Sequence, residues 1–191
     1  RLAFADRLRP DAEDFIDWLR AQGLPVVLLS GDRPAAVEAL ADRLGIADWS
    51  AEMRPADKLA RLEAMRAEGR RVLMIGDGLN DAPSLAAAFA SISPATGADV
   101  TQTAADLVFQ SERLGPVADA ILVARKSRAL VLGNFVLAGG YNALAIPLAV
   151  AGFVTPLIAA AAMSASSILV TLNALRLARF RSRSGVADGG A

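Results

Sequence analysis

Two carboxylates and a carboxamide follow a short apolar run in the middle of the chain. Residues 72–75 are Val-Leu-Met-Ile, and they lead directly into Gly76-Asp77-Gly78-Leu79-Asn80-Asp81. The apolar run predicts a short buried strand, and the two glycines let the backbone after it turn sharply. Asp77 and Asp81 are therefore expected at the carboxyl end of a strand, where open α/β sheets bind ligands. Hard carboxylate oxygens suit Mg²⁺, which commonly accompanies phosphate chemistry.

Two further polar groups follow other predicted strands. Ser30-Gly31-Asp32 comes directly after an apolar run, and Lys58 lies near the start of a predicted helix. In a phosphoryl-transfer site a hydroxyl holds phosphoryl oxygens, an ammonium neutralises charge and a carboxylate pair holds Mg²⁺. Taken singly, Ser30 is as well explained as a turn cap and Lys58 as a solvated helix residue. The indication of phosphoryl transfer rests on their combination.

The elements that position these groups alternate along the first part of the chain. Helices are predicted at 10–22, 33–44, 55–68 and 83–90, and short strands at 24–29, 48–53, 72–75, 90–93 and 106–109. Strand–helix alternation with right-handed crossovers predicts an α/β fold with a doubly wound parallel sheet. Polar residues at three strand ends then meet where an α/β site is expected.

The chain changes character after residue 113. No Asp, Glu, Lys or Arg occurs in the 47 residues from Ala129 to Leu175, which suits two membrane spans of about 20 residues each. We predict a linker helix from residue 114 and a transmembrane hairpin, 130–151 and 155–175, within a second domain 114–178. Basic residues flank both outer ends, so the soluble domain and both hairpin ends are expected in the cytoplasm. A hairpin buried in a large soluble protein is the alternative.

The charge distribution supports a membrane protein. Residues 1–124 hold 19 acidic and 13 basic residues, whereas the segments that flank the apolar region are basic. This pattern argues against nucleic acid as a partner. The absence of Cys and His excludes disulfides, Cys or His metal sites and Ser-His catalysis within this sequence. The Arg-rich tail 179–191 is expected to be disordered.

The three strand-end motifs and the hairpin together resemble the P-type ATPases, whose phosphorylation domain belongs to the haloacid dehalogenase superfamily. Ser30-Gly31-Asp32 resembles the family's (Thr/Ser)-Gly-Asp motif, Lys58 its phosphate-contacting lysine, and residues 76–83 its hinge motif. The resemblance implies catalytic roles for Ser30, Gly31, Asp32, Lys58, Asn80 and Asp81, Mg²⁺ binding by Asp77 and Asp81, and close approach of the bound group to Gly76 and Gly78.

The hairpin resembles that of the heavy-metal subgroup, because only two apolar helices follow the hinge domain. Tyr141-Asn142 and the segment 163–167, Met-Ser-Ala-Ser-Ser, are similar to the Tyr-Asn and Met-x-x-Ser-Ser motifs of the Cu⁺-transporting members. The resemblance implies that transported Cu⁺, or the equally soft Ag⁺, meets Tyr141, Asn142, Met163, Ser166 and Ser167. A thioether suits Cu⁺. Met163, Ser166, Ser167 and Val170 follow helical spacing and so share a face, although gap filling and helix packing explain each motif alone.

The nucleophile of the family, the Asp of Asp-Lys-Thr-Gly-Thr, has no counterpart in these 191 residues. The resemblance places it upstream of Arg1, with the nucleotide-binding domain, the actuator domain and earlier membrane helices. We therefore expect the C-terminal part of an ATP-driven, Mg²⁺-dependent Cu⁺ exporter of the cell (inner) membrane, inactive by itself, with residues 1–113 as part of its phosphorylation domain. A membrane-anchored phosphatase of the same superfamily and a non-catalytic membrane module are the alternatives.

Overall fold

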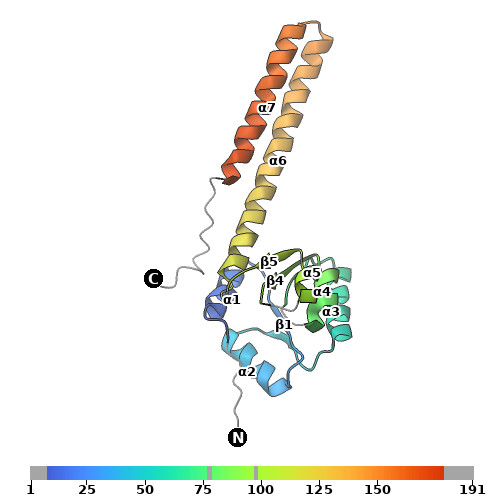
Figure 1. The fold of residues 1–191 in the computed structure, drawn as a ribbon. Helices are drawn as coiled ribbons and strands as arrows, with labels where there is room; N and C mark the ends of the chain where they lie inside the picture. Colours follow the sequence, from blue (N-terminus) through green and yellow to red (C-terminus); the bar gives the residue numbers. More distant parts are fainter. Residues whose placement is uncertain (1–7, 77–78, 97–98, 179–191) are drawn as a thin grey trace. The chain divides into compact units, whose positions relative to one another are not determined.

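The computed structural model describes residues 8–76, 79–96 and 99–178 (Figure 1). These residues divide into two compact units, one that runs to Ala118 and one that begins at Asp119. The expected tail 179–191 lies outside the described residues, as do Asp77 and Gly78.

The first unit alternates helices with short parallel strands. In chain order its elements are α1 (Ala12–Ala21), β1 (Val27–Leu29), α2 (Pro34–Leu44), β2 (Asp48–Ser50), α3 (Pro55–Ala67), β3 (Leu73–Ile75), the 3₁₀ helix η1 (Leu79–Asp81), α4 (Ala82–Ala87), β4 (Ala90–Pro94), α5 (Asp99–Ala104) and β5 (Leu107–Phe109). Every described strand pair is parallel. The predicted α/β fold is confirmed, and α5 is a helix that the sequence pattern did not predict.

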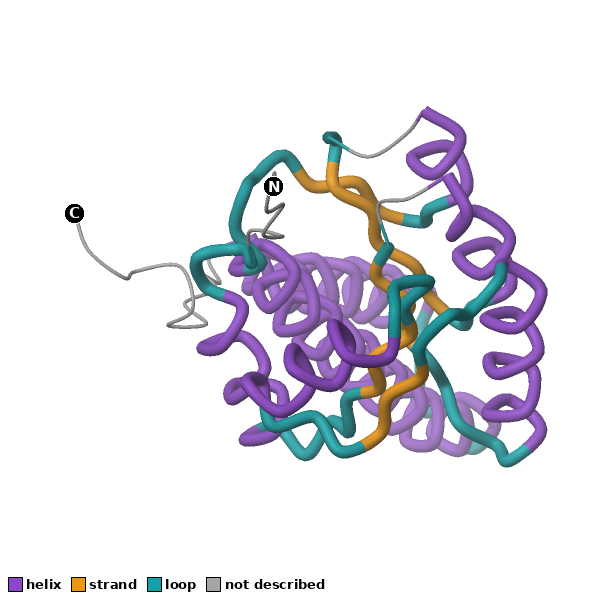
Figure 2. The backbone as a smooth tube through the Cα atoms, turned by 90° about the horizontal axis from the view of Figure 1, so that it is seen from below, coloured by secondary structure: helices purple, strands orange, loops and turns teal. Residues whose placement is uncertain are grey.

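The strands form two ladders. β1 pairs with β2, with Val27 opposite Asp48, and β4 lies between β3 and β5. Figure 2 shows these strands running between the helices of the unit. In the described residues β1 and β3 each pair with one strand, so each has an unpaired edge, and the apolar residues of both are only half-buried.

Local sequence explains where the helices of this unit begin and end. Proline occupies the first position of α2 and of α3, where its missing N–H costs nothing. The Asp57 side chain accepts a hydrogen bond from the backbone N–H of Arg54 at 2.9 Å, which holds the first turn of α3. α2 ends at Gly45, whose φ of 63° favours glycine. The core is formed by apolar residues of these helices, among them Phe15, Val37, Ala41, Leu62 and Leu85.

Residues 9–11 hold the start of α6 (Gly115–Val150) within the first unit. The buried Asp11 carboxylate accepts hydrogen bonds from the backbone N–H groups of Leu114, at 2.8 and 2.9 Å, and of Gly115, at 2.9 Å. Arg9 donates to the Ser111 carbonyl at 3.0 Å. A helix start leaves N–H groups unpaired and favours negative charge, so the Asp11 carboxylate satisfies both requirements.

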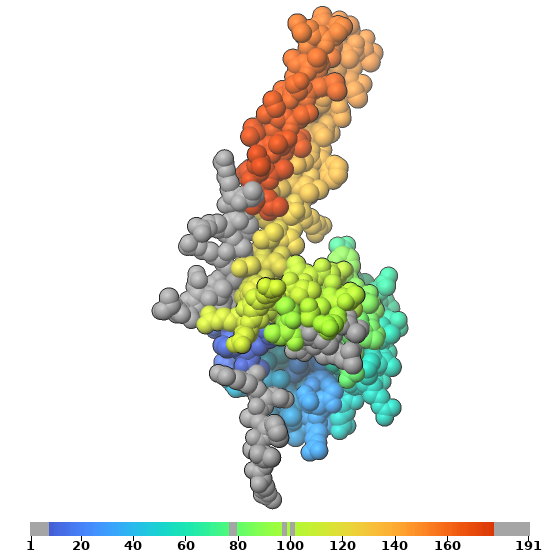
Figure 3. Space-filling view, viewed as in Figure 1, coloured from blue at the N-terminus to red at the C-terminus, as the bar shows by residue number. Residues whose placement is uncertain are grey.

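The second unit pairs the remainder of α6 with α7 (Pro156–Ala178) across the loop 151–155. Both helices are long and apolar enough to cross a membrane, and their apolar windows are not buried in the structure. Figure 3 shows the two helices packed along each other. Phe135 is 70% exposed and Val150 is 85% exposed. The two predicted spans are therefore present as helices, and the described residues do not bury them.

Candidate functional site

Lys58 and Asp81 form a buried ion pair. The Lys58 Nζ lies 2.6 Å from Asp81 Oδ1, and the two side chains are only 11% and 13% exposed. Lys58 comes from the first turn of α3, and Asp81 ends η1 and precedes α4. Because both charges are largely withdrawn from water, each is costly to leave without the other. The structure thus joins two of the predicted catalytic residues, 23 positions apart.

Gly76 is close to Asp81. A Cβ atom at Gly76 would lie 2.9 Å from Asp81 Cβ and 3.0 Å from Asp81 Oδ2. Any side chain at this position would therefore displace the carboxylate, because backbone and Cβ atoms yield little. We expected this glycine to admit a bound group, and the group that approaches it in the structure is Asp81.

The Ser-Gly-Asp turn after β1 is closed by its own side chains. Ser30 Oγ donates a hydrogen bond to Asp32 Oδ2 at 2.7 Å and accepts one from the backbone N–H of Asp32 at 3.2 Å. Backbone bonds tie this turn to the segment before α3, since Met53 donates to the Ser30 carbonyl and Glu52 to the Asp32 carbonyl. The same segment leads into the helix that carries Lys58.

Glu52 is a residue of this region that sequence reasoning missed. Its φ of 51° is unusual for a residue other than glycine, and its backbone N–H donates to the Asp32 carbonyl at 2.9 Å. No sequence pattern marked it, because glutamate is not a typical residue for this conformation.

The predicted catalytic residues do not all meet. Among the described residues, side-chain hydrogen bonds join Lys58 to Asp81 and Ser30 to Asp32. No described hydrogen bond joins one of these pairs to the other. Asn80 is exposed. The predicted Mg²⁺ ligand Asp77 and the glycine at position 78 lie outside the described residues.

The Asp81 carboxylate fits the role of a magnesium ligand at this turn. Asp81 Oδ1 is held by Lys58, and Oδ2 of the same carboxylate faces Gly76. In phosphate sites Mg²⁺ is bound by one or two carboxylates together with phosphate oxygens and water, so a large cluster of acidic side chains is not needed. In the part of the chain that the structure describes, no three Asp or Glu side chains converge.

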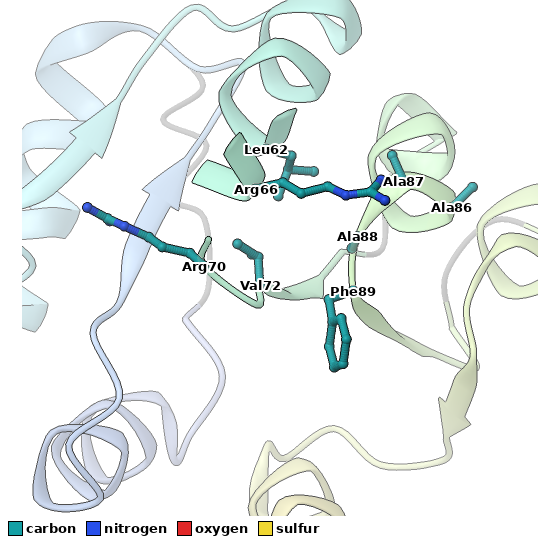
Figure 4. A pocket seen from close by; sticks show the side chains of 8 residues that line it. All are labelled: Leu62, Arg66, Arg70, Val72, Ala86, Ala87, Ala88 and Phe89. Atoms are coloured by element: carbon teal, nitrogen blue, oxygen red, sulfur yellow. The ribbon is translucent and has the colours of Figure 1, made fainter. Parts of the chain in front are cut away.

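A separate cavity of about 320 Å³ lies between α3 and the segment from α4 to β4 (Figure 4). Its lining consists of Leu62, Arg66, Arg70, Val72, Ala86, Ala87, Ala88 and Phe89. None of the predicted site residues lines it. One of its two arginines, Arg70, pairs with Glu68. The neighbouring Arg71, which is not a lining residue, lies over the ring of Phe89, which is one. We do not assign this cavity to the phosphoryl chemistry.

The polar residues of the hairpin divide between two surfaces. Tyr141 and Ser166 are half-buried, whereas Asn142, Met163 and Ser167 are exposed, Met163 to 67%. Of the four residues predicted to share a face, Ser166 and Val170 are half-buried, whereas Met163 and Ser167 are exposed. The hairpin by itself does not gather the five predicted metal-contacting residues into one cluster.

Two hairpin residues that sequence reasoning did not select form a contact between the helices. Asn173 Nδ2 of α7 donates to Asn134 Oδ1 of α6 at 2.7 Å. Their position within a long uncharged segment was a signal, because polar residues at membrane depth usually face other helices.

Comparisons with known proteins match both parts of the chain. Residues 1–88 match the haloacid dehalogenase-like hydrolase family. The nitrogen fixation protein FixI of Bradyrhizobium diazoefficiens is 57% identical over 169 residues, which are 88% of this chain and 23% of that protein. The copper-exporting P-type ATPase of Bacillus subtilis is 39% identical over 180 residues, 94% of this chain and 22% of that protein.

A solved structure is similar to most of this chain. The crystal structure of a zinc-transporting PIB-type ATPase in the E2.Pi state matches with a TM-score of 0.86 and 34% identity, over 90% of this chain and 28% of that chain. The chain thus spans about a quarter of the length of the curated relatives it matches.

Proposed function

The chain is a homologue of the copper-exporting P-type ATPases and carries a haloacid dehalogenase-like hydrolase domain, and on this basis we propose that it is the C-terminal part of an ATP-driven Cu⁺ exporter. The observation that carries the proposal is the buried Lys58–Asp81 pair beside a strand-end turn, in a chain that also has two membrane-length helices. The first feature suits phosphoryl chemistry, and the second suits transport across a membrane.

Lys58 is held ready to neutralise a phosphoryl group. An ammonium has three N–H donors, and one of them is directed to Asp81 Oδ1, so the others are available to phosphoryl oxygens. Ser30 differs, because its hydroxyl proton is already donated to Asp32. A phosphoryl oxygen would have to replace Asp32 as its acceptor. Mg²⁺, held by Asp77 and Asp81, would supply further positive charge to the same oxygens.

The nucleophile of the proposed reaction would come from another part of the protein. β1 and β3 each have an unpaired edge in the described residues, and their apolar side chains are only half-buried. Ser30 follows the first of these strands and Gly76 the second. A parallel strand that paired with these edges would end beside both turns, where an aspartate could receive the γ-phosphoryl group. We therefore expect the 191-residue chain alone neither to hydrolyse ATP nor to transport metal.

A phosphate-release assay tests whether the chain alone can hydrolyse ATP. The purified chain with ATP and Mg²⁺ should release no phosphate above a Lys58→Met control. The reading frame upstream of residue 1 should encode Asp-Lys-Thr-Gly-Thr and a Cys-Pro-Cys helix, and the protein it encodes should show metal-stimulated ATPase activity. Mg²⁺-dependent turnover by the 191-residue chain would refute the proposal. A short phosphatase loop upstream would instead favour the membrane-anchored phosphatase.

The proposed cargo is Cu⁺, with Ag⁺ as its soft equivalent. The copper-exporting relatives and the exposed thioether of Met163 support this choice, while the likeness to a zinc-transporting structure requires a direct test. In the full-length protein, Cu⁺ and Ag⁺ should stimulate ATPase activity more than Zn²⁺ does. Met163→Leu should raise the Cu⁺ concentration for half-stimulation, whereas Leu169→Ala, at another exposed position of α7, should not.

We also propose that both ends of the hairpin face the cytoplasm, because basic residues flank the outer ends and not the loop. The 191-residue chain contains no cysteine, so a single cysteine introduced into this chain, expressed by itself, reports topology cleanly. A cysteine placed by Ala151→Cys in the loop should react with an impermeant maleimide added outside intact cells. One placed by Ser127→Cys should react only after the membrane is opened, and the reverse pattern would overturn this orientation.

A further inference from the structure

The two helices of the hairpin face each other along a narrow seam. Between residues 130 and 145 of α6 and between 159 and 177 of α7, half-buried residues recur every three or four positions, and all residues between them are exposed. The seam residues are Leu130, Asn134, Ala138, Tyr141 and Ala145 of α6, and Ala159, Ala162, Ser166, Val170, Asn173 and Leu177 of α7. Such spacing is typical of two helices that pack along their lengths.

A directed hydrogen bond crosses this seam. Asn173 Nδ2 lies 2.7 Å from Asn134 Oδ1, and the Arg176 guanidinium lies 3.5 Å from Asn173 Oδ1. A guanidinium can only donate, so the oxygen of the Asn173 amide must face Arg176 and its amino group must face Asn134. The arginine thereby fixes the orientation of the amide that makes the bond.

The amide pair lies about two helical turns from two of the residues proposed to meet the metal. The helices are antiparallel, so a step toward the loop raises the residue number on α6 and lowers it on α7. Toward the loop, Tyr141 lies seven residues after Asn134 on α6, and Ser166 lies seven residues before Asn173 on α7. Because seven residues make about two helical turns, both stay on the seam and at the same height.

Amides can determine the register that apolar residues leave open. Small apolar side chains exchange one neighbour for another when helices slide, so they resist sliding weakly. Sliding would separate Asn134 from Asn173 and leave both amides in apolar surroundings without their partner, which is unfavourable. A single asparagine at a core position of a coiled coil fixes register for the same reason.

We propose that Asn134 and Asn173 are positioning residues that fix the register of the hairpin and so hold Tyr141 level with Ser166. The assignment of a transport role to this register rests on the proposed function. The register itself does not, because it follows from the contact between the helices.

Disulfide cross-linking measures the register directly, since the chain has no native cysteine. In the full protein in membranes, with every cysteine outside these 191 residues replaced by serine, Ala145→Cys is combined with Ala162→Cys, at the same level, or with Ala159→Cys, nearly one turn away. Mild oxidation with iodine should link the level pair faster. With Asn134→Leu and Asn173→Leu, which keep similar volume and favour insertion, the ratio of the two rates should fall about threefold to tenfold, the range expected for one interhelical hydrogen bond.

Thr171→Val and Ser164→Ala are the matched controls. Both hydroxyls bond to carbonyl groups of their own helix, at 2.9 and 3.0 Å, and lie off the seam. Neither substitution should change the ratio of cross-linking rates. An unchanged ratio in the Asn134→Leu/Asn173→Leu protein, or an equal fall in the controls, would overturn the proposal.

The metal response separates this inference from the proposed function. In an active pump, the double leucine variant should lose coupling between metal and ATPase activity while it remains inserted. A protein whose cross-linking depends on the two asparagines but whose ATPase activity ignores Cu⁺, Ag⁺ and Zn²⁺ would refute the pump and leave the register assignment intact.

Discussion

Several polar side chains in the unit that ends at Ala118 bond to other elements of the chain, whereas most of the described polar side chains in the hairpin do not. Lys58 of α3 meets Asp81 of η1, and Asp11 meets the start of α6. In the hairpin, Ser164 and Thr171 bond to their own helix, and Asn142 is exposed. The Asn134–Asn173 contact is the described exception.

The two units differ in what fixes the positions of their polar side chains. In the first unit, charges are withdrawn from water only together with a partner, so the position of each group is fixed by the fold. In the hairpin, small residues provide a seam and leave the other faces, Met163 included, to surroundings outside the described contacts. The first unit therefore specifies its own site, and the hairpin specifies mainly its own register.

Removing the charge of Lys58 should break this contrast most strongly. Lys58→Met keeps much of the volume but leaves the buried Asp81 carboxylate without its ammonium partner, so we expect a loss of about 3–5 kcal/mol of unfolding free energy. Both tryptophans of the chain, Trp18 and Trp49, lie in the first unit, so urea unfolding in detergent followed by tryptophan emission reports on that unit alone.

The double variant Lys58→Met/Asp81→Asn is the control for this experiment. It removes both charges and should recover a large part of the loss, because no uncompensated charge remains. A single variant that costs less than about 1 kcal/mol, the value typical of exposed pairs, would contradict the buried pair.

Asp11→Ala should have the next largest effect. It leaves the N–H groups of Leu114 and Gly115 without their acceptor, at an expected cost of about 2 kcal/mol. Hydrogen exchange should accelerate at these two amides. Asp14→Ala, at an exposed position of α1, should change stability by no more than about 0.5 kcal/mol. Equal exchange in both variants would show that Asp11 does not hold the start of α6.

Glycine substitutions compare the two units at the level of the backbone. Gly76→Ala forces a Cβ against Asp81 and should cost about 1–3 kcal/mol in the tryptophan-monitored transition. Gly139→Ala, where a Cβ meets no atom within 4 Å, should leave that transition unchanged. A tolerated Gly76→Ala would mean that Asp81 can move freely, against the fixed geometry inferred for the first unit.

A substitution at Ser84 should have the smallest effect on unfolding free energy, and the opposite sign. Its hydroxyl is fully buried and finds no partner among the described residues, so Ser84→Ala should stabilise the first unit by up to about 1 kcal/mol. Ser91 is also buried, but its hydroxyl bonds to Asp106 at 3.0 Å. Ser91→Ala should therefore destabilise the unit, and the two serine variants should differ in sign.

Local sequence patterns were sufficient to predict most of the elements and the polar turns that follow β1 and β3. Apolar runs placed β1 and β3, prolines and glycines placed the limits of α2 and α3, and the uncharged region placed two apolar helices. α5 escaped prediction because it is short and holds Thr and Val, which are weak helix formers.

Pairings between distant residues could not be predicted in the same way. Lys58 could have met either acidic residue of the turn, and no pattern linked Asp11 to residues 103 positions away. Helical spacing placed Met163, Ser166 and Ser167 on one face of α7. It could not show that Ser166, and not the other two, is half-buried between the helices.

Three features follow from the sequence alone: the alternation of elements, the strand-end placement of the polar motifs and the apolar character of the last part of the chain. Each depends on the period and polarity of neighbouring residues. Three contacts are visible only in the tertiary structure, where Lys58 bonds to Asp81, Asp11 holds the start of α6 and Asn134 bonds to Asn173. These contacts join residues that are far apart in the chain, and the packing of whole elements brings them within hydrogen-bonding distance.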